Sequence, residues 1–261
     1  MHVNRLSLLN SLLSVINENE EDDAYAVLAN YFLDHYSELD QLNIYDVAAD
    51  CFISRSSIRR FCQSIGCENF RTLKNEYSDY DDKKENRLSY MKKENFRSSL
   101  TEDINSIIAE LNNRMNTKEV DLIVDRIHQA ERVVFLAADT SASAIKDFQQ
   151  SMVFGGKIIR IISETFTDNT LLNKMTNNDY LMTFSMTGTF ANASKELVKS
   201  CQAFKSLVTV SRKPEFMEVY DKVYHLSALD KSAMADIYGK YGVNYMLDVI
   251  ISAYLRKYAV K

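Results

Sequence analysis

Hydrophobic residues in the first 77 positions recur at helical spacing. One helix face is formed by Leu6, Leu9, Leu12, Leu13 and Ile16. Another is formed by Tyr25, Leu28, Ala29 and Phe32. No stretch of this half alternates convincingly between apolar and polar residues. The pattern predicts an all-helical domain over residues 1–77.

A strongly charged segment with few apolar residues follows, over residues 78–98. It indicates a domain boundary, formed either by a flexible linker or by a solvated connecting helix. We place this connector at residues 78–105. Amphipathic helical spacing resumes from Leu100 to Ile127 and predicts one helical stretch there.

Beyond residue 130 the pattern changes to short apolar runs rich in β-branched residues, separated by helical stretches. This alternation is typical of βαβ units around a buried parallel sheet. We therefore expect a three-layer α/β domain, flavodoxin-like with a mostly parallel sheet, over residues 106–261. The last helix is expected at 241–257. The predicted strands cover 133–136, 157–162, 180–184, 206–210 and 222–226.

Composition describes an ordinary globular chain of 261 residues that is 46% hydrophobic and 26% charged. No stretch approaches the ~18 apolar residues of a membrane span, and the first ten residues lack a signal-peptide pattern, so we expect a cytoplasmic protein. The four cysteines form no C-x-x-C pair, which favours reduced, packed thiols. We expect neither a metal nor a cofactor.

Charge is distributed unevenly along the chain. The net charge of −5 argues against a general nucleic-acid binder. Between residues 51 and 75, however, five basic side chains face only Glu68, whereas the preceding 50 residues are rich in acids. One short basic segment in an acidic protein indicates a local anionic partner.

Residues 43–63 have the layout of a helix-turn-helix. Ile44, Val47 and Ala48 give the first helix its buried face, and Ser54 is placed to cap the second helix. The exposed start of such a second helix reads base edges and phosphates in the major groove of DNA. The alternative is a solvated basic helix on a helical bundle. The candidate DNA-binding residues are Ser54, Arg55, Ser56, Ser57, Arg59, Arg60 and Lys74.

The run ISRSSIRRFCQSIGCENFRTLKNEY resembles the N-terminal domain of RpiR/MurR-type transcription regulators. The resemblance implies binding to double-stranded DNA at a palindromic operator, and a homodimer or tetramer. Phe52 departs from the pattern, since a small or polar residue is usual in this turn. A bulky residue is disfavoured at positive φ, so we expect a different local turn.

Residues 106–255 are similar to the sugar-isomerase (SIS) domain that follows in this family. The match includes the family's Ser-x-Ser/Thr-Gly element, here Ser185-Met186-Thr187-Gly188. The resemblance implies a sugar or phosphosugar effector held by hydroxyl and backbone N–H groups at helix N-termini. The alternative is that these hydroxyls only cap helices. The candidate effector-binding residues are Thr140, Ser141, Ser185, Thr187, Gly188 and Thr189.

The first of the two loops departs from the family pattern G-x-G-x-S. Ala137 and Asp139 replace both glycines, which hinders close approach of a ligand to the backbone. The Asp139 carboxylate would also repel a phosphate, at a cost on the order of 3 kcal/mol per pair of unit charges at ~5 Å. We expect a modified or lost phosphate site, and therefore either an altered sugar ligand or a domain that only dimerises.

An SIS fold also serves sugar-phosphate isomerases, which need a general base. Glu164, just past a predicted strand, is the best candidate, and His128 and His225 show no pairing pattern. An isomerase has no use for an exposed basic helix in front of its catalytic domain. We therefore expect a regulator rather than an enzyme, with no catalytic residues.

Overall fold

The computed structural model describes residues 8–77, 88–115, 117–137, 139–163 and 169–259. The chain divides into two compact units, residues 1–93 and 94–261. Each unit has its own hydrophobic core, and each is described here by itself. No helix of the described part is long and apolar enough to cross a membrane.

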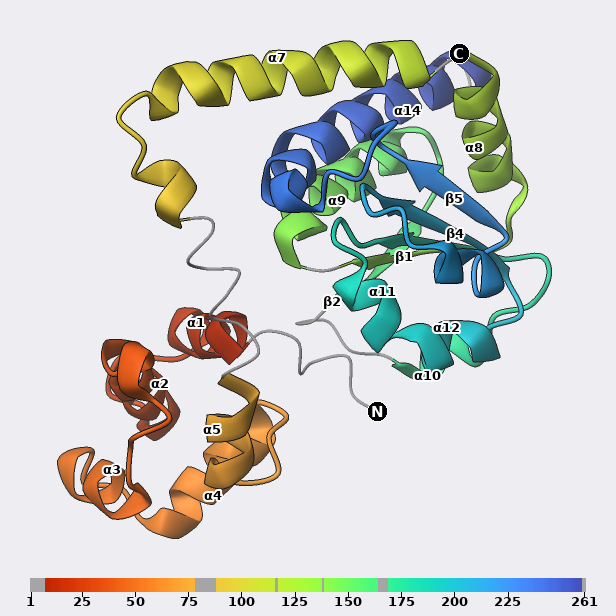
Figure 1. Cartoon of the computed structure of the whole chain (residues 1–261). Helices are drawn as coiled ribbons and strands as arrows, with labels where there is room; N and C mark the ends of the chain where they lie inside the picture. Colours follow the sequence, from red (N-terminus) through yellow and green to blue (C-terminus); the bar gives the residue numbers. More distant parts are fainter. Residues whose placement is uncertain (1–7, 78–87, 116, 138, 164–168, 260–261) are drawn as a thin grey trace. The chain divides into compact units, whose positions relative to one another are not determined.

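The regular structure described in the N-terminal unit is helical, in agreement with the spacing of its apolar residues (Figure 1). Its core is built around the ring of Phe32. The Phe61 ring lies 5.7 Å from it and the Phe70 ring 6.0 Å, measured between ring centroids. Ile58 and Val47 are completely buried beside them. The helices are α1 (Leu8–Glu18), α2 (Ala24–Asp34), α3 (Ile44–Asp50), α4 (Arg55–Ser64) and α5 (Phe70–Tyr77).

The C-terminal unit contains a five-stranded parallel sheet with the strand order β2-β1-β3-β4-β5. All five predicted strands are present, with bounds that shift by up to two residues. β1 and β3 are buried along their whole length, which explains their unbroken apolar sequence. The strands are β1 (Val133–Ala137), β2 (Ile159–Ser163), β3 (Tyr180–Phe184), β4 (Phe204–Thr209) and β5 (Lys222–His225).

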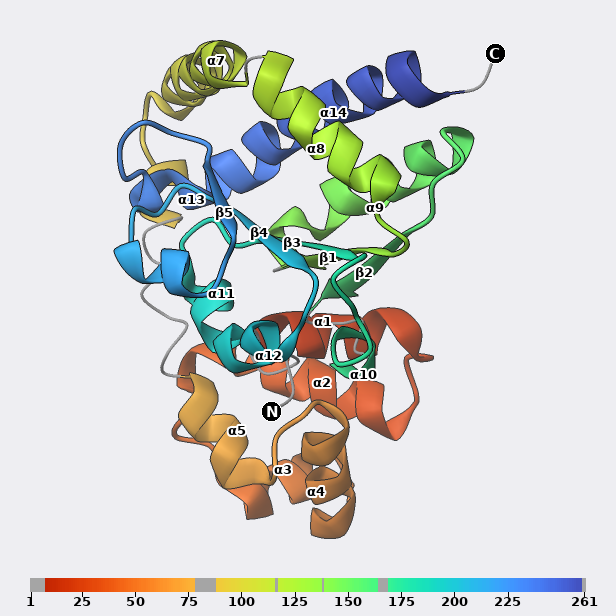
Figure 2. The same ribbon diagram turned by 90° about the vertical axis from the view of Figure 1, so that its right-hand side faces the viewer.

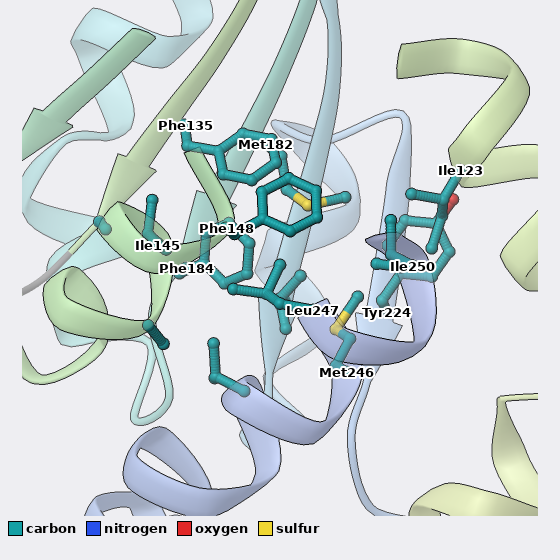
Figure 3. Close-up of a cluster of buried hydrophobic side chains, with 14 of the residues drawn as sticks. Ile123, Phe135, Ile145, Phe148, Met182, Phe184, Tyr224, Met246, Leu247 and Ile250 are labelled. Atoms are coloured by element: carbon teal, nitrogen blue, oxygen red, sulfur yellow. The ribbon is translucent and has the colours of Figure 1, made fainter. Parts of the chain in front are cut away.

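Helices cover both faces of this sheet, so the three-layer prediction is confirmed (Figures 1 and 2). One face carries α8 (Thr117–Gln129), α9 (Asp139–Phe154) and α14 (Val243–Tyr258). The other carries the short helices α10 (Asn169–Leu172), α11 (Thr189–Ala193) and α12 (Lys195–Ser200). Side chains of β1, β3, α9 and α14 meet in the main core, shown in Figure 3.

Three local expectations need correction. The helical stretch predicted from Leu100 to Ile127 is two helices, because α7 (Phe96–Arg114) ends before α8 begins. The last helix starts at Val243, after a π-helical turn at Tyr238–Gly242. The turn at Phe52 was expected to avoid positive φ, yet Phe52 has φ 54°.

Helix α7 begins inside the segment that the sequence indicates as a connector, and it belongs to the C-terminal unit. Its buried residues Ile107 and Leu111 pack into that unit's core. Glu110 accepts hydrogen bonds from the Ala228 N–H and from the Tyr238 hydroxyl. The chain thus enters the C-terminal unit along a helix fixed by both packing and polar contacts.

Candidate functional site

The two helices of the predicted helix-turn-helix are joined by a short turn whose backbone is hydrogen-bonded to α3. Asn43 caps α3 by accepting the Tyr45 N–H at 3.0 Å. At the other end the Ile53 N–H donates to the Ala48 carbonyl at 3.1 Å, and Ile53 is partly buried against the core. These bonds bring the chain directly from the end of α3 to the start of α4.

Ser54 caps α4, as the sequence predicts. Its hydroxyl oxygen accepts the Ser57 N–H at 3.2 Å and lies 2.8 Å from the Ser56 hydroxyl. Ile58 and Phe61 anchor the helix in the core and are completely buried. The opposite face of α4 is therefore left to polar side chains.

Three arginines of that polar face are exposed: Arg55, Arg59 and Arg60. The Arg55 guanidinium lies over the ring of Tyr45, 4.8 Å from its centroid. Arg60 donates from Nη2 to the Ser57 hydroxyl at 3.2 Å. The first turns of α4 thus present cations whose positions are supported by neighbouring side chains.

Lys74 stands apart from this group. Its ammonium donates to the Leu42 carbonyl at 2.8 Å and lies 5.9 Å from the centre of the Phe70 ring. It is half-buried in α5 and ties that helix to the loop before α3. Of the seven predicted DNA-binding residues, six lie in or directly before α4, whereas the Lys74 charge is engaged within the domain.

The predicted effector residues follow β1 and β3, which are neighbours in the sheet. Ala137 at the end of β1 is paired with Phe184 at the end of β3. In the strand order found here, β1 and β3 flank the switch point at which α/β sheets bind ligands outside their carboxyl ends. The topology therefore brings both predicted loops to one edge, at a favourable place for a ligand.

In the first loop, Asp139 and Thr140 form the start of α9, and their side chains lie outside the described part of the structure. Ser141 follows in the first turn and is buried, with 1% of its surface exposed. The hydroxyl of Ser141 therefore faces the protein interior or a closed site, rather than open solvent.

In the second loop the polar groups bond to one another. The buried Ser185 hydroxyl accepts the Ala191 N–H at 3.1 Å. The Thr187 hydroxyl donates to Oγ1 of Thr189 at 3.0 Å and accepts the Thr189 N–H at 3.3 Å. The Gly188 N–H donates to the Ser185 carbonyl. The Thr187 hydroxyl and the N–H groups of Gly188 and Thr189 are thus used within the loop, whereas the Ser185 hydroxyl serves as an acceptor.

Gly188 is required by the shape of this loop. It has φ 81°, and a Cβ atom there would come within 2.3 Å of Cζ of Phe216. The family element Ser-x-Thr-Gly therefore has a structural role here, independent of any ligand.

Of the three residues weighed for catalysis, the structure describes His128 and His225, which have separate partners. Glu164 lies outside the described residues. The His128 ring stacks on Tyr258 with centroids 3.6 Å apart, and burial beside Arg212 lowers the pKa of His225. No cluster of metal-ligating side chains occurs among the described residues.

An aromatic residue of α3 that the basic run does not indicate lies beside the start of α4. Tyr45 is 61% exposed, on the second position of α3, and carries Arg55 on its ring. Its signal in the sequence was an aromatic residue at a position that the helical pattern assigns to solvent.

Residues 3–84 match the model of the helix-turn-helix domain of the rpiR family. No curated protein sequence matches the chain. Among solved structures, the NanR protein of Vibrio vulnificus complexed with ManNAc-6P is similar at 16% identity and a TM-score of 0.51, covering 97% of this chain and 92% of NanR.

The sugar isomerase domain of an RpiR transcription factor from Sphaerobacter thermophilus is similar as well. It is 11% identical with a TM-score of 0.51, and the match covers 63% of this chain and 92% of that domain. At sequence identities of 16% and 11%, these similarities show a shared fold and nothing more. The chain therefore carries a helix-turn-helix domain of the RpiR family, followed by a C-terminal domain with the sugar-isomerase (SIS) fold.

Proposed function

We propose that this protein is a transcription regulator of the RpiR type that binds double-stranded DNA through α4. The observation that carries the proposal is the group of three exposed arginines at the start of a capped helix, Arg55, Arg59 and Arg60. Arginine can bond guanine in a bidentate manner and can also neutralise phosphates. Because the whole chain has a net charge of −5, this local surface must supply the attraction to DNA.

We further propose that the SIS domain binds a sugar or phosphosugar effector beside the ends of β1 and β3, and that it dimerises. The sheet's switch point favours this edge, and NanR, which shares the fold, was solved with a sugar phosphate. A dimer would present two α4 helices to the half-sites of a palindromic operator. The effector would act by biasing the placement of the two DNA-binding domains through residues 78–105.

The DNA-binding proposal is tested by a mobility shift with the DNA upstream of the protein's own gene. We expect a shift with the intact chain and a loss of affinity of about 1–3 kcal/mol in Arg60→Ala, with a smaller salt dependence. Arg256→Ala removes an exposed arginine of α14 and should leave the shift unchanged. Equal binding by the intact chain and Arg60→Ala would exclude α4 as the DNA-reading helix.

The effector proposal is tested by a thermal-shift screen of sugars and phosphosugars, followed by titration calorimetry. Asp139 would repel a phosphate, so we expect weak binding of ordinary sugar phosphates and stronger binding in Asp139→Gly or Asp139→Ser. Tight binding of a sugar phosphate by the unmodified chain would contradict the role given to Asp139. We expect no isomerase turnover with any ligand found.

A further inference from the structure

Phe52 combines two unfavourable features. It has φ 54°, and it is the one residue other than glycine with positive φ in the described part of the chain. Its side chain is also 96% exposed. An aromatic ring in the left-handed region, surrounded by solvent, lowers the stability of the fold and contributes no packing.

The backbone of the turn explains the conformation but not the side chain. The Phe52 N–H donates to the Ala49 carbonyl at 3.3 Å, and the next N–H donates to Ala48. These bonds close α3 and direct the chain into α4. Glycine or asparagine would allow the same path at lower cost, so the fold gives no reason for a phenylalanine here.

The location of Phe52 indicates what its side chain contacts. It lies three residues before Arg55, so their Cα atoms are within about 10 Å of one another along the chain. Arg55 and its supporting ring, Tyr45, are also exposed. Phe52 is therefore at the same end of α4 as the cations that we assign to DNA, and its exposed ring has no packing role that would keep it from a partner there.

DNA offers apolar groups at this kind of surface. The thymine methyl group is the apolar feature of base edges in the major groove, and the deoxyribose rings border it. A protein partner would be favoured by a continuous apolar patch, whereas the neighbours of Phe52 on α4 are serines and arginines. Charge complementarity thus favours DNA as the partner.

We propose that Phe52 makes an apolar contact with DNA at the start of α4, against a thymine methyl group or a neighbouring deoxyribose. A contact with the methyl group would contribute to sequence selection, whereas a contact with deoxyribose would contribute to affinity alone. The inference rests on the proposed DNA-binding function. It gives the strained turn a role in DNA recognition. The free energy gained from the contact would offset the free energy that the positive φ of Phe52 costs the free protein.

The test compares the full-length protein with Phe52→Gly and Phe52→Asn. The DNA is a duplex enriched from random sequence by the unmodified chain, and affinity is measured by fluorescence anisotropy at several salt concentrations. We expect about tenfold weaker binding with an unchanged salt slope, since no phosphate contact is lost. The thermal midpoint of unfolding should stay the same or rise, because both residues tolerate positive φ.

Replacing thymine by uracil in the duplex separates the two apolar contacts. If Phe52 touches a methyl group, uracil weakens binding by the unmodified chain and has no further effect on Phe52→Gly. If uracil has no effect on either, the contact is with deoxyribose. Met217→Ala, which alters an exposed apolar residue of the C-terminal unit, should leave DNA affinity unchanged.

Two results would overturn the proposal. Unchanged DNA affinity in both variants would show that Phe52 does not contact DNA. A fall in thermal midpoint together with affinity would assign Phe52 to the fold instead. If the unmodified chain enriches no DNA at all, the DNA-binding function itself fails, which is a distinguishable outcome.

Discussion

Both units place serine and threonine hydroxyls at the start of a helix, but they leave different groups free for a ligand. In the N-terminal unit, Ser54 caps α4, and the arginines that follow remain exposed. In the C-terminal unit, the hydroxyls of Ser185 and Thr187 and the N–H groups beside them bond to one another. The first surface has exposed charged groups to offer, whereas the second already uses several of its donors in internal hydrogen bonds.

The difference shows that a sequence motif for binding can be present while its polar groups are already hydrogen-bonded within the protein. A ligand at α4 meets exposed cations. A ligand at the β3–α11 loop must displace internal hydrogen bonds, each worth ~1 kcal/mol net, before it gains its own. Together with Asp139 in the neighbouring loop, this favours weak or altered effector binding in the C-terminal unit.

The largest expected effect concerns Asp179. It directly precedes β3 and lies at the amino ends of the strands, away from the two loops. Its carboxylate has no exposed surface and accepts hydrogen bonds from the backbone and guanidinium of Arg132 and from the Thr176 N–H. In Asp179→Asn an amide group would face these donors. We expect the free energy of unfolding to fall by about 3 kcal/mol. This is the lower end of the range for breaking a buried ion pair, because Arg132 is partly exposed.

Acid should also destabilise the unmodified protein through Asp179. Burial would raise the pKa of Asp179, but the hydrogen bonds and the charge of Arg132 outweigh burial and hold this pKa below its usual value. The contribution is therefore present above the unfolded pKa of ~3.9 and disappears as pH falls through the lower folded value. Urea denaturation of both proteins at neutral pH, continued in acid from pH 4 downwards, would measure both effects.

Hydrogen exchange separates the two units in this experiment. Asp179→Asn should accelerate exchange in the sheet and leave α4 protected, since each unit has its own core. Asp236→Asn, at an exposed position, serves as the control. Equal acceleration in both units would show that they unfold together and would weaken the comparison between them.

The next effect comes from a matched pair of serines. Ser54→Ala removes an exposed cap and should cost ~1 kcal/mol of stability. Ser185→Ala leaves the N–H of the buried residue Ala191 without its partner and should cost ~1–3 kcal/mol. Chemical denaturation of both variants tests the order. If Ser185→Ala costs nothing, its hydroxyl is free for a ligand and the contrast between the two sites is wrong.

Much of this architecture could be predicted from local sequence patterns. The strands were found because buried parallel strands are continuously apolar, as in residues 180–184. The start of α4 was found because Ser54 precedes an amphipathic run and a capping side chain acts within three residues. Both signals depend on neighbours in sequence.

The remainder depends on partners that are distant in sequence. Lys74 bonds to the Leu42 carbonyl, 32 residues away, so its charge could not be assigned from the local basic run. The break between α7 and α8 falls within a stretch whose apolar spacing continues. Phe52 was recognised as unusual, but local preference alone argued for a different turn, whereas the bonds to α3 impose positive φ.

The smallest expected effect concerns Tyr45, which supports a cation of the proposed DNA-binding surface. Its ring lies 4.8 Å from the Arg55 guanidinium, a contact worth ~0.5–1 kcal/mol at an exposed site. Tyr45→Leu should therefore weaken DNA binding by roughly two- to fivefold in anisotropy titrations, because Arg55 must be ordered on binding.

Tyr45→Phe provides the control, since it keeps the ring and removes only the hydroxyl. It should bind DNA like the unmodified chain. A matching loss in Tyr45→Phe would indicate that the hydroxyl itself contacts DNA, and no loss in Tyr45→Leu would show that Arg55 needs no support. Either outcome would revise the view that α4 is held ready for DNA while the β3–α11 loop is not held ready for its ligand.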